Sequence, residues 1–140
     1  MRLFIDTWGW VVIHNRRETR HGEISAYYQH VREQRGMIYT SDYVLDETFT
    51  LLFRRLPFSQ ARESLEMLGR AIREGYLLLE RITAGRFEQA KVLRLRFQDK
   101  PWISFTDLSS MVVMDELNIR YVLTGDAHFG QVGMSFQTVP

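Results

Sequence analysis

The sequence contains no cysteine, only two lysines and no long hydrophobic run. The lack of cysteine excludes a disulfide framework, a thiolate metal site and a cysteine nucleophile, so any metal would have to bind carboxylates or histidines. The longest apolar stretches, such as residues 8–13, are far too short to span a bilayer, and the start of the chain lacks the basic and apolar regions of a signal peptide. We therefore expect a cytoplasmic protein with no membrane span.

The chain also lacks a large excess of either charge. Its formal net charge of +1 gives the whole molecule no strong field that would attract nucleic acid. Arginines do cluster locally, and their planar guanidinium groups suit bidentate contacts with phosphate. The clusters are Arg16, Arg17 and Arg20, then Arg54 and Arg55, then Arg94 and Arg96. The simplest interpretation of any one cluster is nevertheless a solvated helix face.

Strand and helix patterns alternate along the chain, with no internal repeat and no linker. Strands are expected at residues 2–5, 37–40, 76–82, 121–123 and 136–139, and helices at 8–15, 23–35, about 42–56, 59–74, 83–98 and 107–117, with a turn or short helix at 126–130. Ser41, Ser59, Thr83 and Thr106 are the expected N-caps. This order predicts a three-layer α/β domain over residues 1–140, with a central, mainly parallel sheet flanked by helices.

Two aspartates follow predicted strands directly or nearly so. Asp6 comes immediately after the strand at 2–5, and Asp126 comes three residues after the strand at 121–123. In open α/β sheets, ligands bind outside the carboxyl ends of the strands. We therefore expect both carboxylates at the ligand-binding edge of the sheet.

Two further acids lie on predicted helices. Asp107 follows the expected N-cap Thr106, where helix amide groups and the helix dipole favour an anion. Glu47 lies near Val44 and Leu51 in the helical repeat, so we expect it on an inward face, where a carboxylate beside apolar neighbours requires a partner or a metal.

Each acid alone has an ordinary structural explanation, as an N-cap or an exposed helix residue. Together they are four carboxylates from separate segments, and hard divalent cations prefer such oxygen ligands. We therefore predict a site for Mg²⁺ or Mn²⁺ formed by Asp6, Glu47, Asp107 and Asp126.

The segments around these acids resemble a known family. Phe4-Ile5-Asp6-Thr7, residues 41–47, residues 104–111 and Leu123-Thr124-Gly125-Asp126-Ala127-His128-Phe129 are similar, in order and spacing, to PIN-domain nucleases. The size of the chain is most similar to the VapC-type toxins of toxin-antitoxin pairs. One departure is Trp8-Gly9-Trp10, where the family usually has smaller or aliphatic residues.

The resemblance implies a Mg²⁺- or Mn²⁺-dependent endoribonuclease that cleaves single-stranded or looped RNA by hydrolysis. It assigns catalytic and metal-binding roles to Asp6, Glu47, Asp107 and Asp126, and places the Thr7, Ser110 and Thr124 hydroxyls nearby. Adjacent helix residues point about 100° apart, so Asp46 and Glu47 cannot both face the metal, and the family pattern favours Glu47. It further implies a cognate antitoxin protein and a homodimer.

Other interpretations remain open. The histidines, including His128, are predicted to be surface or packing residues, and Trp102 a core or interface residue and not a base-stacking platform. A phosphoryl-receiving domain would need an adjacent acid pair and a lysine that the sequence does not supply. A nuclease without an antitoxin, or a catalytically silent α/β module that binds RNA or protein, are the remaining alternatives.

Overall fold

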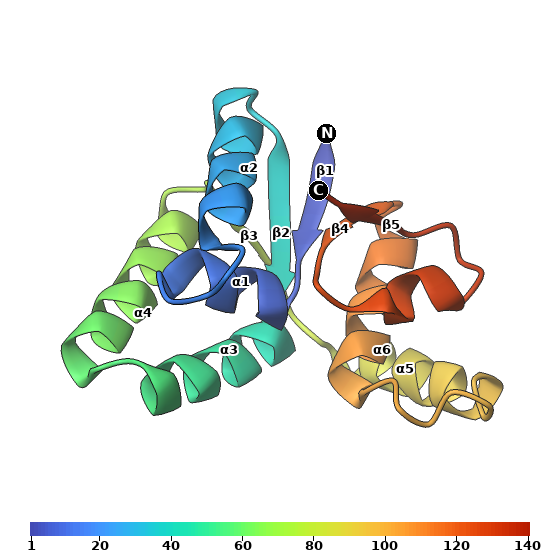
Figure 1. Cartoon of the computed structure of the whole chain (residues 1–140). Helices are drawn as coiled ribbons and strands as arrows, with labels where there is room; N and C mark the ends of the chain where they lie inside the picture. The colour runs from blue at the N-terminus through green and yellow to red at the C-terminus, as the bar shows by residue number, and fades with distance from the viewer.

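The computed structural model describes residues 1–140 as a parallel sheet with helices packed on both faces (Figure 1). The strands are β1 (Arg2–Ile5), β2 (Met37–Ser41), β3 (Leu78–Glu80), β4 (Tyr121–Leu123) and β5 (Gln137–Val139). The helices are α1 (Thr7–His14), α2 (His21–Glu33), α3 (Asp42–Arg55), α4 (Phe58–Arg73), α5 (Ala84–Arg96), α6 (Phe105–Glu116) and the 3₁₀ helix η1 (Ala127–Gln131).

The sheet has the strand order β3-β2-β1-β4-β5, and every neighbouring pair is parallel. The central strand β1 carries Leu3, Phe4 and Ile5, which are fully buried, as expected for a strand covered on both faces. The predicted three-layer α/β fold with a mainly parallel sheet is therefore confirmed.

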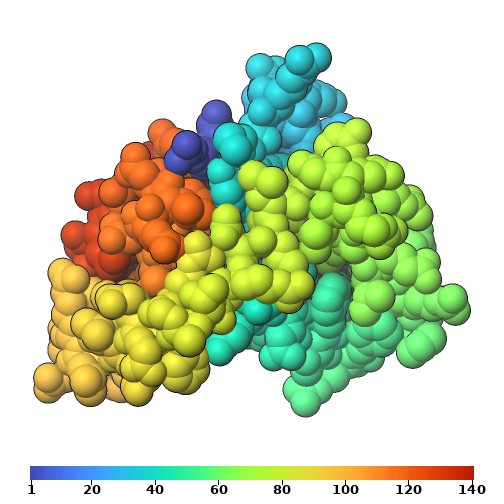
Figure 2. Space-filling model, turned by 180° about the vertical axis from the view of Figure 1, so that it is seen from behind, coloured from blue at the N-terminus to red at the C-terminus, as the bar shows by residue number.

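The helices form the two outer layers. Figure 1 shows α1, α2 and α4 on one side of β1 and β2, and α5 and α6 on the other side. From behind, α4 and α5 flank the segment that carries β3 (Figure 2). Trp10, Phe4 and Phe129 are the largest fully buried side chains and belong to one core cluster. No helix has both the length and the apolar composition needed to cross a bilayer.

Two of the predicted N-caps are confirmed. The Ser41 hydroxyl accepts from the Val44 amide at 3.1 Å, and the Thr83 hydroxyl accepts from the Arg86 amide at 3.2 Å. Both side chains therefore satisfy amide groups that would otherwise lack a partner in the first helical turn.

The other two predicted N-caps are wrong. Helix α4 begins one residue before Ser59, after Pro57, whose restricted φ angle of −53° suits a helix start without a side-chain cap. Helix α6 is capped by Ser104, whose hydroxyl accepts from the Asp107 amide at 3.0 Å, and Thr106 lies inside the first turn. Ser104 and Thr106 are both residue types that can cap a helix, and in this structure Ser104 is the N-cap.

The topology determines where polar residues gather. Because the strands are parallel, their carboxyl ends lie at one edge of the sheet, where α1 follows β1 and α3 follows β2. Asp6 follows β1 at this edge, and the segment with Thr124 and Asp126 follows β4. Strands β1 and β4 are neighbours, so these residues converge.

Candidate functional site

A hollow of about 480 Å³ opens at this edge of the sheet. All four acids expected from the sequence line it, although they come from four separate segments. The lining residues used below are Asp6, Thr7, Trp8, Glu47, Arg55, Trp102, Asp107, Asp126 and His128. The structure therefore brings the four carboxylates around one cavity, and their chemical roles stay a prediction.

Asp6 is fixed by the start of α1. Its Oδ1 accepts from the Gly9 amide at 3.3 Å, which makes Asp6 the N-cap of that helix. Its Oδ2 accepts from the Thr124 hydroxyl at 2.6 Å, and the Thr124 oxygen in turn accepts from the Asp126 amide at 3.0 Å. The hydroxyl of Thr124 thus links the strand ends of β1 and β4.

The Asp6 carboxyl group is nearly inaccessible, with 5% of the residue exposed. Burial raises its pKa from 3.8 to about 7. The Thr124 hydroxyl and the Gly9 amide favour the ionised form, whereas the negative charges of Asp107 and Asp126 oppose it. Burial and the neighbouring acids therefore disfavour the ionised form of Asp6.

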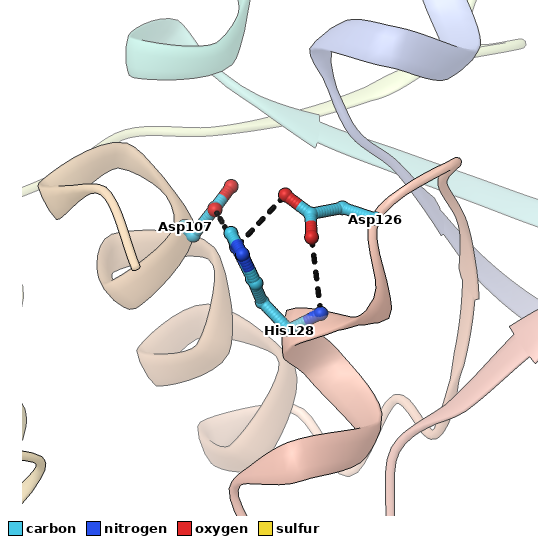
Figure 3. Close-up of side chains that lie close together, drawn as sticks. All are labelled: Asp107, Asp126 and His128. Atoms are coloured by element: carbon cyan, nitrogen blue, oxygen red, sulfur yellow. Dashed lines mark hydrogen bonds and ion pairs between the residues drawn. The ribbon is translucent and has the colours of Figure 1, made fainter. Parts of the chain in front are cut away.

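Asp107, Asp126 and His128 form a second, connected group (Figure 3). The Nδ1 atom of His128 lies 2.8 Å from Asp126 Oδ2 and 3.3 Å from Asp107 Oδ2. The His128 amide also donates to Asp126 Oδ1 at 3.0 Å. The imidazole therefore lies between two carboxylates that would otherwise repel each other.

The three side chains could also hold a cation together. One ligand atom from each of Asp107, Asp126 and His128 lies within 4.8 Å of the others. Burial raises the pKa of Asp107 above its ordinary value, and the charge of Asp126 adds to this effect, whereas His128 counteracts it. Asp6 and Glu47 lie outside this tight group but line the same hollow.

The interpretation of His128 as a surface or packing residue is wrong, because its side chain faces the acids. It is the main site residue that reasoning from the sequence missed. The signal was its position two residues after Asp126 in a short turn, because an aspartate that caps such a turn holds the second residue beside its own carboxylate. The other histidines do not line this hollow.

Glu47 lies differently from the expectation of an inward-facing residue. It is exposed, whereas Val44 and Thr48 on the same helix are buried. The pKa of Glu47 is raised by partial burial of its carboxyl group and then by the charge of Asp107, and the Thr106 and Thr7 hydroxyls counteract this. Asp46 is also exposed but does not line the hollow, so the geometry favours Glu47 over Asp46.

The predicted hydroxyl residues are not equivalent. Thr7 is buried and lines the hollow, and Thr124 binds Asp6 directly. Ser110 is buried on α6, donates to the Thr106 carbonyl at 3.1 Å and does not line the hollow. The structure thus brings two of the three hydroxyls to the site.

The arginine clusters contribute little charge next to the acids. Arg94 donates to backbone carbonyls between α5 and α6, which is a structural role. Arg55 lines the hollow and pairs with Glu18 at 3.9 Å. No arginine or lysine forms an ion pair with any of the four site acids; their one cationic partner would be a protonated His128.

Tryptophans form parts of the wall. The ring of Trp8 packs so closely on Gly125 that a Cβ atom there would lie 2.4 Å from it, so position 125 requires glycine. The Arg20 guanidinium lies 5.4 Å from the centre of the Trp8 ring, and Glu23 holds it at 2.9 Å. Trp102 also lines the hollow, but it is exposed. The prediction that it is a core residue is therefore wrong.

Comparison with known proteins gives a consistent result. The PIN domain family model matches residues 3–134. The 23S rRNA-specific endonuclease VapC20 of Mycobacterium tuberculosis is 30% identical over 94% of both chains.

Solved structures agree. The crystal structure of M. tuberculosis VapC20, described as a sarcin-ricin loop cleaving toxin, matches 94% of this chain and 95% of its own with a TM-score of 0.79 and 30% identity. The VapBC2 complex of Rickettsia felis, bound to a promoter DNA fragment, contains a chain with a TM-score of 0.73 and 18% identity, over 99% of this chain and 98% of its own, which shows the shared fold. The resemblance to PIN-domain nucleases of the VapC type is confirmed, and the chain belongs to the PIN-domain family.

Proposed function

We propose that this protein is a metal-dependent endoribonuclease and the toxin of a toxin-antitoxin pair, with residues 1–140 acting as one nuclease domain. The observation that carries the proposal is the cavity lined by Asp6, Glu47, Asp107 and Asp126, none of which pairs with arginine or lysine. Concentrated negative charge without such partners is costly in a folded protein. A bound cation explains why the fold maintains it.

The donor set fits Mg²⁺ or Mn²⁺, since it offers carboxylate oxygens and one imidazole. Asp107, Asp126 and His128 could hold the ion, and Asp6 and Glu47 line the same cavity. Such an ion lowers the pKa of a bound water and stabilises charge on the attacking and leaving oxygens of a phosphodiester.

The protein itself keeps the ligands in place. Thr124 holds Asp6 through a 2.6 Å hydrogen bond, and the α1 amide of Gly9 holds the other oxygen. The His128 Nδ1 atom lies between the Asp107 and Asp126 carboxylates, at 3.3 and 2.8 Å, and so links the two side chains. Such neighbours of metal ligands commonly change metal affinity or activity by about 10- to 100-fold.

RNA is the substrate that the relatives support. VapC20 is named as a 23S rRNA-specific endonuclease and described as cleaving the sarcin-ricin loop. We infer that this chain likewise cleaves looped or single-stranded RNA, in which unpaired bases are accessible to a protein. The sarcin-ricin loop of 23S rRNA is the first RNA to test.

The partners follow from the same relatives. A VapBC complex matches the fold, and we propose that an antitoxin binds this chain and covers the acidic cavity. We further propose a homodimer and a cytoplasmic location. A nuclease without an antitoxin is the alternative, and it predicts that overexpression leaves growth unchanged.

The test is RNA cleavage by the purified protein. We expect cleavage of an RNA carrying the sarcin-ricin loop in Mn²⁺ and none in EDTA. An inactive protein at every Mn²⁺ concentration, with a normal melting curve, would support the catalytically silent binding module instead.

A further inference from the structure

We propose that Trp102 stacks on an unpaired base of the RNA beside the cleaved phosphodiester, and so selects substrates with an unstacked base at that position. This inference rests on the proposed function, because it names how the same cavity would recognise its RNA. The observation is an exposed indole, held on a fixed loop, at the rim of the acidic cavity.

Trp102 is exposed between two residues that belong to the core. It is 56% exposed, whereas Phe97 and Ile103, on either side of it, are 6% and 1% exposed. Phe97 and Ile103 belong to the core cluster and anchor both ends of the segment between α5 and α6. The indole is therefore directed away from the core, although the core lies only one residue away along the chain.

The loop that carries Trp102 is held by one arginine. The Arg94 guanidinium donates to the carbonyl oxygens of Phe97 at 2.9 Å and Lys100 at 2.7 Å, and also to that of Ile103. The Trp102 indole N–H also lies 3.4 Å from the Gln131 side-chain oxygen, which accepts from it. A fixed aromatic ring loses little conformational entropy when it binds a ligand, so this arrangement favours binding.

Trp102 lines the same cavity as the residues proposed to carry out the reaction. It lines the cavity together with Asp6, Asp107, Asp126 and His128, and Trp8 forms another part of the wall. The Trp8 side chain is largely covered, because it is packed on Gly125 under Arg20, which leaves Trp102 as the more accessible indole. A phosphodiester at the acids would place a neighbouring base within the same cavity.

The chemistry of the surface favours a base over other ligands. Bases present flat aromatic faces that stack on tryptophan with little dependence on sequence. The nearby carboxylates would repel an acidic peptide, whereas a nucleotide can bring its phosphate to the acids together with the metal. An apolar protein segment that uses the same indole is the competing occupant, and the experiment below separates the two.

The test compares Trp102→Leu and Trp102→Phe with Tyr76→Leu. Tyr76 is a matched control because it is 55% exposed and precedes β3, at the amino end of the sheet, away from the cavity. Binding of a labelled adenosine decaribonucleotide and of an abasic ribose-phosphate decamer is measured at low salt, both in EDTA and in Mn²⁺. In Mn²⁺ every protein also carries Asp6→Asn, so that the result does not depend on cleavage. The KM and kcat for RNA cleavage in Mn²⁺ are measured separately.

We expect Trp102→Leu to weaken binding of the adenosine decamer by roughly 5- to 100-fold, with a smaller loss for Trp102→Phe. Binding of the abasic decamer should be the same for all variants, and Tyr76→Leu should bind both like the wild type. The KM should rise in Trp102→Leu while kcat changes little. The wild type could also bind the base-containing RNA through Trp102 and cleave no RNA. That result would refute the proposed nuclease activity and leave the role of Trp102 in RNA binding intact.

Three results would overturn the inference. One is equal binding of the adenosine decamer by wild type and Trp102→Leu, which would assign the indole to a protein partner. Another is an equal loss for the abasic decamer, which would mean that stacking is not the cause. The third is the absence of binding to either decamer both in EDTA and in Mn²⁺.

Discussion

Helix α1 lines two hollows whose chemistry is opposite. The larger one, of about 650 Å³, contains Arg16 and Arg17, and its histidines have partners: His14 bonds to Ser64 at 2.9 Å and His21 to the Val12 carbonyl at 2.7 Å. The smaller one, of about 480 Å³, contains four carboxylates with no arginine or lysine partner. The candidate site is therefore indicated by the carboxylates that the fold holds together, and not by the volume of the hollow.

Each hollow also contains a group whose ionised form is strongly disfavoured by its surroundings. Burial raises the pKa of Asp6 to about 7, and the negative charges of Asp107 and Asp126 add to the effect. Burial lowers the pKa of His14 to about 4, and the charge of His21 adds to it. Burial therefore shifts the pKa values of Asp6 and His14 in opposite directions. Substituting each residue in turn tests the two shifts separately.

The largest expected effect is on cleavage. Asp6→Asn should reduce Mn²⁺-dependent RNA cleavage by at least roughly 100-fold, because a charge at the metal site is lost. The asparagine oxygen can still accept from the Gly9 amide, and its amide nitrogen can donate to the Thr124 oxygen, so the fold should persist. His14→Gln, in the larger hollow, is the control and should cleave at the wild-type rate in the same gel assay. An equal loss of cleavage in Asp6→Asn and His14→Gln would mean that the smaller hollow is no more important for the reaction than the larger one.

The next effect is on stability without metal. The folded state binds the Asp6 proton more tightly than the unfolded chain, so this residue's contribution is present below pH 3.8 and is lost as pH rises to about 7. Replacing it by asparagine should therefore stabilise the protein relative to wild type, increasingly from pH 4 to 7, by on the order of 4 kcal/mol at the upper end. Urea unfolding in EDTA across this range measures the difference. A constant difference would show that Asp6 ionises in the folded protein as it does in the unfolded chain.

His14 should show the opposite pH dependence. Its contribution is present above pH 6.5 and is lost as pH falls to about 4, because only the unfolded chain takes up a proton in that range. His14→Gln should therefore gain stability relative to wild type as the pH falls, by about 3 kcal/mol at most. The same unfolding series measures it, and a gain that instead increases with pH would contradict the burial of neutral His14.

Metal binding gives a smaller effect. A cation that binds only the folded protein, at about 100 times its dissociation constant, adds roughly 2.7 kcal/mol to the free energy of unfolding. We expect Mn²⁺ to raise the wild-type melting temperature by about 8 °C and that of Asp126→Asn by much less. A full shift in the variant would exclude Asp126 as a ligand.

The smallest effect concerns Ser64, the partner of His14. Ser64→Ala removes one hydrogen bond in the larger hollow and should lower the free energy of unfolding by about 1 kcal/mol. Cleavage and the Mn²⁺ shift should be unchanged. Reduced cleavage at equal stability would mean that the larger hollow takes part in the reaction.

The fold was largely predictable because strand and cap signals are local. The apolar residues before Asp6 predict β1, and Ser41 and Thr83 cap helices as expected. Local signals fail where two equivalent residues compete, as at Ser104 and Thr106, or where proline starts a helix without a side-chain cap, as before Ser59.

The site was less predictable, because side-chain directions depend on tertiary packing. The convergence of the acids follows from strand order, but the inward rotation of His128 depends on the turn capped by Asp126. The exposure of Trp102 depends on the loop that Arg94 holds, 8 residues away along the chain. The roles of the four acids remain a prediction.

The most direct test of the central claim is the dependence of RNA cleavage on Mn²⁺ concentration in wild type and Asp126→Asn. The account predicts no cleavage in EDTA, a rate that saturates with Mn²⁺ in the wild type, and a requirement for far more Mn²⁺, or no activity at all, in Asp126→Asn. Cleavage that persists in EDTA, or an identical Mn²⁺ dependence in the two proteins, would contradict a metal site at the carboxylates.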